Sequence, residues 1–392
     1  RGLGDVYKRQ MFVMERYEDT IALGLDAVQI DRYGLRFDGC RLRVRDPQAW
    51  QAFWDLDVLV QLMNLLLERD GVKSGDGFGF VKPIGSCSPL LRLLLHALDE
   101  SCDAFVSAGV AGLRASLAAL LRRLPAEAWQ PVAALCGHAH LDMVWLWPEM
   151  ATRRKAVHTF ATALRLLERY PELTFVQSQP ALYRGVAQDA PELCSAIEQH
   201  VRAGRWEVNG AFEVEPDNHL PCGEALARSL VHGQRHIATL RGSTSKLCWL
   251  PDVFGYSAAL PQILRLGGVE NFFTTKMTWS QVTRFPYNSF VWRGHDGSEV
   301  LAHLCPTNYN GTVDLGDLSQ ATRDHRQVAV HPEVLLPTGY GDGGGGVSEA
   351  MCERARRLEN LAGAPRARWT TGDAFFRRLQ RVRAQLPVYQ GE

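Results

Sequence analysis

The residues at 137–148, GHAHLDMVWLWP, carry the local pattern most typical of a metal site. His138, His140 and Asp142 are spaced by two, and alternate side chains of an extended segment point to the same face. An imidazole and a carboxylate on one face at a strand end suit zinc. The same residues could simply cap a strand, and the spacing leaves both interpretations open. The adjacent indoles Trp145 and Trp147 favour a platform for a sugar or another ring.

A second candidate is Asp252, which follows an apolar run in the segment CWLPDVFGYSAALPQIL at 248–264. An Asp at such a place is often a helix N-cap or part of a turn. It is also placed to present a carboxylate at the carboxyl end of a strand, where it could bind a metal ion or act as a nucleophile. The local sequence is compatible with either role.

Two further segments concentrate charged or flexible residues. In FEVEPDNHLPCGE at 212–224, ionisable residues crowd a loop that is either a solvated acidic loop or part of a site: Glu213, Glu215, Asp217, His219 and Glu224. The segment GYGDGGGG at 339–346 lacks the Lys-Ser/Thr pair of a phosphate-binding loop. Its glycines are expected to let the backbone approach a ligand closely, with Asp342 presented at its start.

These segments lie in a region where strand and helix patterns alternate. Strands are expected at 132–140, 173–179, 205–210, 245–252 and 271–276. Helices are expected between them, at 152–170, 191–203, 223–240 and 259–267. This alternation predicts βαβ units and a parallel sheet. Polar chemistry in such folds gathers at the carboxyl ends of the strands, which is where the candidate residues lie.

The first part of the chain has a different pattern. Apolar residues recur at helical spacing from about residue 46 to 66, and helices are also expected at 90–98 and 103–124. Residues 11–50 are expected to be strands or a ragged lead-in, and the glycine-rich segment 71–85 a loop. We therefore predict a non-native leader at 1–10, a mostly helical domain at 11–130 and an α/β domain at 131–392. The irregular start and an end within an apparent strand suggest a piece of a longer sequence.

Composition excludes several classes of protein. With 392 residues, 46% hydrophobic and 22% charged, the chain is neither disordered nor fibrous. Equal numbers of Lys+Arg and Asp+Glu, 43 each, argue against a nucleic-acid partner. No apolar run approaches the roughly 18–20 residues of a membrane span, so no membrane partner is expected. The nine Cys are scattered without a Cys-x-x-Cys pair, which is typical of reduced thiols in a cytoplasmic protein.

Taken together, the motifs resemble glycoside hydrolase family 38, the α-mannosidases, and in particular its cytosolic and bacterial branch. The matching segments, in family order, are GHAHLDMVWLWP, FVQSQPALY, GRWEVNGAFEVEPDNHLPCGEAL, WLPDVFGYSAALPQIL, FFTTKMTWSQVTRFPYNSFVWRGHDGSEVLAH and GYGDGGGG. They cover about 132–392 and, more weakly, the helical lead-in. Several long motifs in order are more specific than a single glycine-rich match.

The resemblance implies a seven-stranded α/β barrel with one zinc ion. His140 and Asp142 match the family's His-x-Asp metal pair, and Asp252 matches the aspartate that is both nucleophile and metal ligand. Asp342 falls where the family's candidate acid/base carboxylate lies. The implied substrate contacts are Trp145, which matches the indole that stacks on bound mannose, Asp217 and Tyr256.

The implied activity is that of a retaining α-mannosidase, a hydrolase that acts on mannose-containing oligosaccharides by a zinc-assisted double displacement. The sequence departs from the family at Phe212, where Trp is usual. It also ends at 390–392, where the family has a strand carrying its last metal-binding His. We therefore expect a partial site, with little or no activity in residues 1–392 alone.

Two alternatives stay open from the sequence. A metal-dependent polysaccharide deacetylase also uses Asp and His at the strand ends of a similar barrel, but through metal-bound water and without an Asp nucleophile. A non-catalytic glycan-binding fragment is the other alternative. Labelling of Asp252 by a mannose-derived electrophile would separate the first alternative from a mannosidase. The joint presence of His140, Asp142, Asp252 and Asp342 argues against a decayed parent gene.

Overall fold

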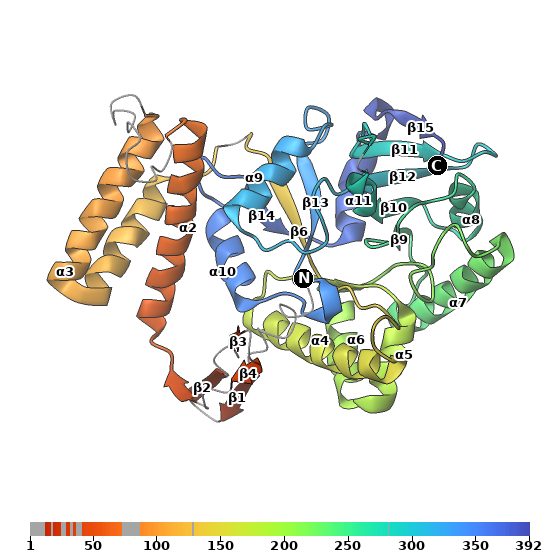
Figure 1. The fold of residues 1–392 in the computed structure, drawn as a ribbon, viewed down its shortest axis with the longest axis horizontal. Helices are drawn as coiled ribbons and strands as arrows, with labels where there is room; N and C mark the ends of the chain where they lie inside the picture. Colours follow the sequence, from red (N-terminus) through yellow and green to blue (C-terminus); the bar gives the residue numbers. More distant parts are fainter. Residues whose placement is uncertain are drawn as a thin grey trace. The chain divides into compact units, whose positions relative to one another are not determined.

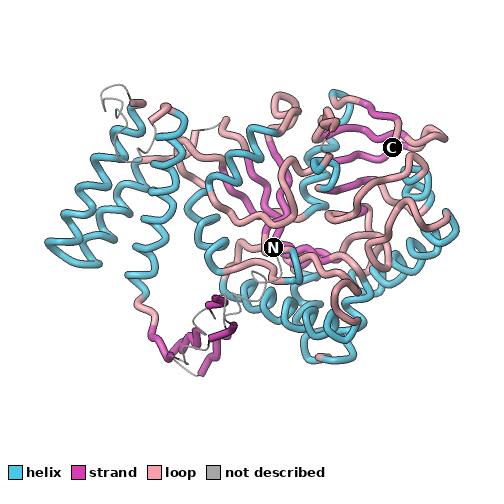
Figure 2. Tube along the Cα trace, viewed as in Figure 1, coloured by secondary structure: helices cyan, strands magenta, loops and turns pink. Residues whose placement is uncertain are grey.

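The computed structural model describes residues 12–16, 19–24, 29–31, 34–36, 41–72, 87–127, 129–280 and 282–392. Its contacts divide the chain into two compact units. The N-terminal unit comprises residues 1–127 with 360–364, and the larger unit comprises residues 128–359 with 365–392. Figure 1 labels most of the elements of both units, and Figure 2 shows that each contains helices and strands. The expected mixed α/β class is confirmed.

The N-terminal unit combines short strands with helices. Strands β1 (Phe12–Arg16), β2 (Asp19–Gly24) and β5 (Arg41–Val44) form an antiparallel sheet, and β3 (Gln29–Asp31) pairs with β4 (Gly34–Arg36). Helix α2 (Pro47–Arg69) follows, and α3 (Pro89–Arg123) accounts for the later helical patterns. The side chain of Asp46 caps α2 by accepting a hydrogen bond from Ala49 N at 2.7 Å. Most of the segment expected as a glycine-rich loop lies outside the described residues.

Helix α3 reverses direction at Gly109, whose φ of 62° and ψ of −152° are not helical. The hydroxyl oxygens of Ser101 and Ser116 lie 2.8 Å apart, although fifteen residues of unbroken helix would span about 22 Å. The element is therefore a helical hairpin, and Figure 1 shows its two arms side by side. Within the described residues, α3 is the one helix long and apolar enough to be a candidate membrane span, which the sequence did not predict. A single such helix is weak evidence, and the hairpin shows that it is not one straight rod.

The larger unit contains two five-stranded sheets among the residues that the structure describes. One sheet has the order β15-β11-β12-β10-β9, and in the other β13, β6, β7 and β8 are neighbours, with β14 also on β6. The bounds of these strands are β6 Val132–His138, β7 Phe175–Gln177, β8 Trp206–Val208, β9 Leu247–Trp249, β10 Asn271–Thr274, β11 Ser289–Arg293, β12 Glu299–Leu304, β13 Glu333–Thr338, β14 Arg366–Trp369 and β15 Val388–Gln390. All neighbouring pairs are parallel except β11 with β12.

Helices connect the parallel strands, as the sequence predicts. Their bounds are α4 Glu149–Arg169, α5 Pro180–Asp189, α6 Glu192–Arg202, α7 Gly223–Arg241, α8 Leu260–Leu266, α9 Leu315–Asp324, α10 Glu349–Leu358 and α11 Gly372–Gln380. The strands and helices expected between residues 132 and 276 are all present, with the observed strands shorter by one to several residues at their ends. The alternation of apolar and amphipathic segments was therefore a reliable guide to the βαβ units.

Among the described residues, strand pairing does not close the two sheets into one barrel, so the expected seven-stranded barrel, incomplete at its C-terminal end, is not confirmed. At one pair of edges, Gly210 N just after β8 donates a hydrogen bond to Leu247 O of β9 at 3.3 Å. A second contact runs from an inner strand to an edge strand: Nε2 of His303 in β12 accepts a hydrogen bond from Leu335 N of β13 at 3.2 Å. Because β12 already pairs with β10 on one side and β11 on the other, its backbone has no free edge for β13, and the contact is made by the side chain.

Aromatic side chains fill much of the core of the larger unit. Phe175 and Trp206 from neighbouring strands lie 4.7 Å apart between ring centroids, and Phe160 of α4 lies 5.2 Å from Trp206. Trp249 of β9 stacks on Phe273 of β10 at 4.1 Å. Full burial of such a side chain stabilises the fold by roughly 1.5–3 kcal/mol. The strand ends that carry the polar residues described next are thereby anchored in a well-packed core.

Candidate functional site

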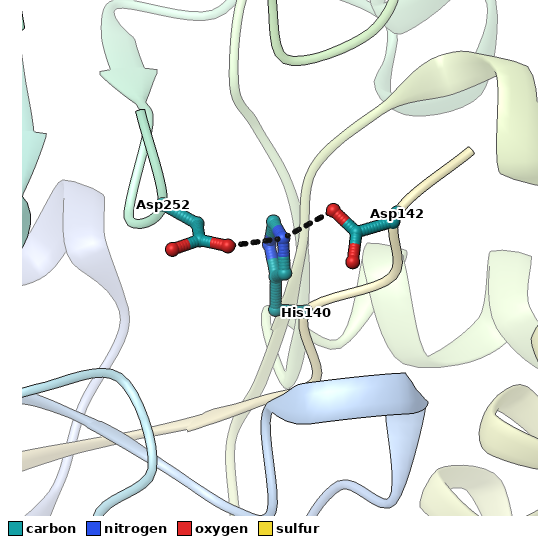
Figure 3. Close-up of side chains that lie close together, drawn as sticks. All are labelled: His140, Asp142 and Asp252. Atoms are coloured by element: carbon teal, nitrogen blue, oxygen red, sulfur yellow. Dashed lines mark hydrogen bonds and ion pairs between the residues drawn. The ribbon is translucent and has the colours of Figure 1, made fainter. Parts of the chain in front are cut away.

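The structure brings His140, Asp142 and Asp252 together at strand ends. His140 and Asp142 follow β6, and Asp252 follows β9. Nε2 of His140 lies 3.3 Å from Oδ1 of Asp142 and 3.2 Å from Oδ2 of Asp252. Figure 3 shows the two carboxylates pointing at the imidazole from opposite sides. The imidazole is buried while both carboxylates are partly exposed, so the cluster can be reached from solvent.

These three side chains fit a divalent cation. One ligand atom from each lies within 4.8 Å of the other two. Ligand atoms about 2.0–2.2 Å from a tetrahedral ion are about 3.3–3.6 Å apart, and two of the three separations are 3.2 and 3.3 Å. One imidazole nitrogen with two carboxylate oxygens is a donor set that zinc accepts. The geometry is therefore that of a possible metal site.

Glu215 lies behind His140, on the side away from the two aspartates. Its Oε1 lies 3.5 Å from Nδ1 of His140 and accepts a hydrogen bond from Ser178 Oγ at 3.1 Å. A histidine that binds metal through one nitrogen commonly has a carboxylate at the other, which fixes its tautomer and orientation. From the sequence, Glu215 was only one of several ionisable residues in a loop that was either solvated or part of a site. Its role could have been predicted only from the contact of that loop with Ser178, the residue that follows β7.

The three carboxylates make this cluster attractive to positive charge. Burial by itself lowers the pKa of His140, but Glu215, Asp142 and Asp252 together raise it well above its usual value. Burial likewise raises the pKa of Asp252, but hydrogen bonds and charge from His140 and Lys276 lower it overall. Asp252 is therefore ionised at neutral pH, as a metal ligand or a nucleophile must be.

His138 does not join the cluster, although it shares the spacing of two. Its Nε2 accepts a hydrogen bond from Trp249 Nε1 at 3.2 Å. Burial, with the charge of His140, lowers the pKa of His138 to about 3, so its ring is neutral. His138 therefore links β6 to β9 inside the fold, and the pattern at 137–148 divides into one structural histidine and one histidine of the site.

Lys276 approaches Asp252 from the opposite side to His140. Its Nζ forms an ion pair with Oδ1 of Asp252, and its side chain is 2% exposed. Lys276 follows β10, so the end of a third strand contributes to the cluster. Lys276 is the last residue of the strand expected at 271–276, but the sequence gave it no role, because a lysine at such a place carries no motif of its own.

Asp342 is held by two residues that follow β12. Its Oδ1 accepts a hydrogen bond from the hydroxyl of Tyr309 at 2.6 Å, and its backbone N donates to Asn310 Oδ1 at 3.1 Å. The ring of Tyr309 also lies 5.2 Å from the ring of His140. Asp342 is thus connected to the cluster through Tyr309, which sequence analysis did not single out.

The glycine-rich segment that carries Asp342 packs against protein. A Cβ on Gly339 would meet His138 O at 2.2 Å, and one on Gly344 would meet Leu141 Cδ2 at 2.4 Å. Both glycines have positive φ, 143° and 79°. In the structure, these two glycines therefore allow the loop to lie against the end of β6. The close approach of the loop to a ligand, expected from the sequence, stays a prediction.

The predicted substrate contacts occupy different environments. Trp145 is 55% exposed and packs edge-to-face on Trp147 at 5.1 Å. Asp217 is exposed, and its Oδ1 accepts hydrogen bonds from His219 N and Leu220 N, which lower its pKa.

Tyr256, in contrast, is 4% exposed. Its hydroxyl donates toward Val253 O and Leu250 O at 2.8 and 3.0 Å. The hydroxyl of Tyr256 is therefore bonded within the fold, and the substrate contact expected at Tyr256 stays a prediction.

The chain is similar to known proteins in sequence and in structure. The family model "Glycosyl hydrolases family 38 N-terminal domain" matches residues 130–392. Alpha-mannosidase G of Dictyostelium discoideum is 37% identical over 257 residues, which are 65% of this chain and 24% of that protein. Alpha-mannosidase 2C1 of Homo sapiens is 38% identical over 259 residues, 65% of this chain and 25% of that protein. The chain thus spans about a quarter of the length of these curated relatives.

Solved structures agree at the level of the fold. The structure of an alpha-mannosidase from Enterococcus faecalis V583 matches with a TM-score of 0.56 and 19% sequence identity, over 67% of this chain and 31% of that one. A second structure from the same organism, titled as a protein in glycosyl hydrolase family 38, matches with a TM-score of 0.52 and 18% identity, over 67% of this chain and 29% of that one.

Proposed function

Because the chain belongs to glycosyl hydrolase family 38, we propose that its site releases terminal α-linked mannose from glycans as part of a retaining α-mannosidase. The observation that carries this proposal is the meeting of Asp252 with His140 and Asp142 at strand ends. An ionised carboxylate beside a cation site suits attack on a sugar whose hydroxyls the cation holds. Since the chain spans about a quarter of its curated relatives, the activity is proposed for the protein that contains it.

Asp252 is the proposed nucleophile and Asp342 the proposed acid/base. The Asp252 carboxylate bonds to the anomeric carbon as the bond from that carbon to the leaving oxygen breaks. The leaving oxygen keeps the electron pair and takes a proton from the Asp342 carboxyl group. Water then bonds to the same carbon and gives a proton to Asp342, while the bond to Asp252 breaks. Two displacements retain the anomeric configuration.

We propose that His140, Asp142 and Asp252 hold one zinc ion. When bound, zinc would act as a Lewis acid that holds sugar hydroxyls and offsets developing charge. Glu215 would keep the His140 ring in the orientation that presents Nε2 to the site. Trp145 is the proposed stacking surface for the sugar because it is an exposed indole on the loop that follows Asp142. Asp217 is proposed to contact substrate hydroxyls from the loop that follows Glu215.

Three broader proposals accompany this function. The partners would be mannose-containing oligosaccharides. The two sheets would act together as one barrel, because the hydrogen bonds of Gly210 with Leu247 and of His303 with Leu335 run from one sheet to the other. The location would be cytoplasmic, on the basis of nine scattered cysteines in an odd number. The deacetylase alternative is not favoured, because relatives with 37 and 38% identity are named α-mannosidases.

The test is the Asp252→Asn variant of the full-length protein, assayed with an aryl α-mannoside. Turnover should fall by several orders of magnitude while the fold is unchanged by circular dichroism, because the variant lacks its nucleophile. A fluorinated mannosyl fluoride should label wild-type Asp252, as located by peptide mass spectrometry. The control is Asp324→Asn, an exposed aspartate outside the cluster. Near-normal activity of Asp252→Asn, or a label on another residue, would exclude this mechanism.

A further inference from the structure

We infer that Lys276 is a positioning residue for Asp252 that speeds release of this carboxylate from the covalent intermediate. The inference rests on the function proposed above and deepens it. Lys276 begins the short helix η2 (Lys276–Trp279), directly beyond β10. Its ammonium pairs with Oδ1 of Asp252, and only 2% of the lysine side chain is exposed. A strongly hydrated ammonium is rarely buried to this extent unless it is paired.

Aromatic rings enclose the Lys276 ammonium. Nζ lies 3.4 Å from the ring centroid of Trp279, 4.4 Å from that of Phe254 and 4.9 Å from that of Tyr309. Ring faces attract a cation without adding a negative charge that would compete with Asp252. The cage therefore keeps the ammonium beside the carboxylate.

The two oxygens of Asp252 face different partners. Oδ1 faces Lys276, and Oδ2 lies 3.2 Å from Nε2 of His140. The loops that carry the two residues are also joined, because Thr275 Oγ1 donates a hydrogen bond to Pro251 O at 2.7 Å. With both oxygens held, the plane of the carboxylate is fixed before substrate binds, and such fixed geometry promotes attack.

The positive charge of Lys276 acts unequally on the two displacements. In the covalent intermediate Asp252 is an uncharged ester. During its breakdown, water bonds to the anomeric carbon and passes a proton to Asp342, while the electron pair of the breaking bond returns to Asp252 as a carboxylate. A charge-assisted contact from Lys276 stabilises the carboxylate as it forms. Without this charge, the second displacement should slow most and the intermediate should accumulate.

The experiment is Lys276→Met in the full-length protein, with an aryl α-mannoside whose leaving group is strongly electron-withdrawing. We expect kcat to fall by about tenfold or more, the range for losing a hydrogen bond to a charged group. KM should fall with it, so that kcat/KM changes less. Intact-protein mass spectrometry should find the hexosyl-enzyme at steady state. After trapping with a fluorinated mannosyl fluoride, reactivation should be slower than in wild type by a similar factor.

Matched variants separate this role from a merely structural one. Lys276→Arg keeps the positive charge and should restore most of kcat. Lys276→Gln keeps a hydrogen-bond donor but has no charge, so it should show the same kinetic defect as Lys276→Met. It also serves as the test variant if Lys276→Met folds poorly. Lys246→Met removes an exposed lysine that pairs with Glu270 at 2.9 Å and should leave the kinetics unchanged. Bound metal, measured in every variant, should not change.

Two results would overturn the inference: a fall in kcat/KM without accumulation of the hexosyl-enzyme, or a Lys276→Arg variant no better than Lys276→Met. Failure of the proposed function is a separate outcome. It would appear as a wild-type protein that neither hydrolyses the mannoside nor is labelled at Asp252.

Discussion

The hydroxyl of Tyr309 donates a hydrogen bond to Oδ1 of Asp342 at 2.6 Å, while its ring lies 5.2 Å from that of His140. Burial, together with the hydrogen bond to Asp342 and the charge of Asp252, raises the pKa of Tyr309 well above its usual value. The hydroxyl therefore keeps its proton and remains a donor at neutral pH. One side chain thus connects the proposed acid/base with the proposed metal ligand.

Tyr309→Phe should lower kcat with an aryl α-mannoside by roughly 10- to 100-fold, because the hydroxyl would no longer stabilise the carboxylate that Asp342 becomes when it gives up its proton. The phenylalanine ring would still fill the space beside His140 and Lys276, so metal content should be unchanged. The control is Tyr287→Phe, whose ring packs with Phe285 and Phe290 away from the cluster. Activity equal to wild type in Tyr309→Phe would show that Tyr309 does not orient the acid/base.

Glu215→Gln should weaken zinc binding by about 10–100-fold, the usual effect of removing the partner of a metal-binding histidine. The carboxylate that faces Nδ1 of His140 at 3.5 Å would be replaced by a neutral amide of the same size. The measurement is a competition titration against a zinc chelator. Glu224→Gln, at an exposed residue of α7, is the matched control. Equal affinities of Glu215→Gln and wild type would remove Glu215 from the site.

The sequence predicted the parts of this site that depend on local patterns. Alternating strands and helices indicated which loops lie at carboxyl ends, and the resemblance then selected His140, Asp142 and Asp252, which the structure places within 4.8 Å of one another. Spacing alone could not separate His138 from His140. A spacing of two places both histidines on the same face of an extended segment. Only the hydrogen bond from Trp249 shows that His138 is used within the fold.

The remaining residues depend on contacts between distant segments. Lys276 and Tyr309 come from separate strand ends, and neither lies in a local sequence motif that would indicate a functional role. The direction of a side chain beyond a turn is equally hidden, so the sequence did not show that the Tyr256 hydroxyl is bonded to Leu250 O and Val253 O. The contact between the two sheets could not be predicted either, because His303, which bonds from β12 to β13, has no sequence neighbour that distinguishes it.

His303→Leu should lower the free energy of unfolding by about 1–3 kcal/mol, because it leaves the buried N–H of Leu335 without an acceptor. Ser289 Oγ, 2.8 Å from Nδ1 of His303, would lose its partner as well. Chemical denaturation at neutral pH measures the effect. His158→Leu, at an exposed position of α4, should change stability by no more than about 0.5 kcal/mol. If both variants had wild-type stability, the link between β12 and β13 would not matter to the fold.

Glu207→Gln should remove part of the pH dependence of stability between pH 5 and 8. Burial, followed by the charge of Asp373, raises the pKa of Glu207 to about 8, although Asn209 and the backbone N of Asp373 donate hydrogen bonds to it. Below the unfolded-state pKa of about 4.5 both states are protonated and folding incurs no penalty. As pH rises toward 8, the unfolded state ionises first, so wild-type stability falls.

The size of the effect follows from about 1.4 kcal/mol per pKa unit and is on the order of a few kcal/mol. Urea denaturation of wild type and Glu207→Gln at pH 5 and pH 8 measures it, and the variant should lose less stability over this interval. Glu198→Gln, at an exposed residue of α6 that pairs with Arg202 at 2.8 Å, is the control and should follow wild type. If Glu207→Gln and wild type lost equal stability between the two pH values, Glu207 would be ionised within the folded protein at pH 5 and its burial would carry no penalty.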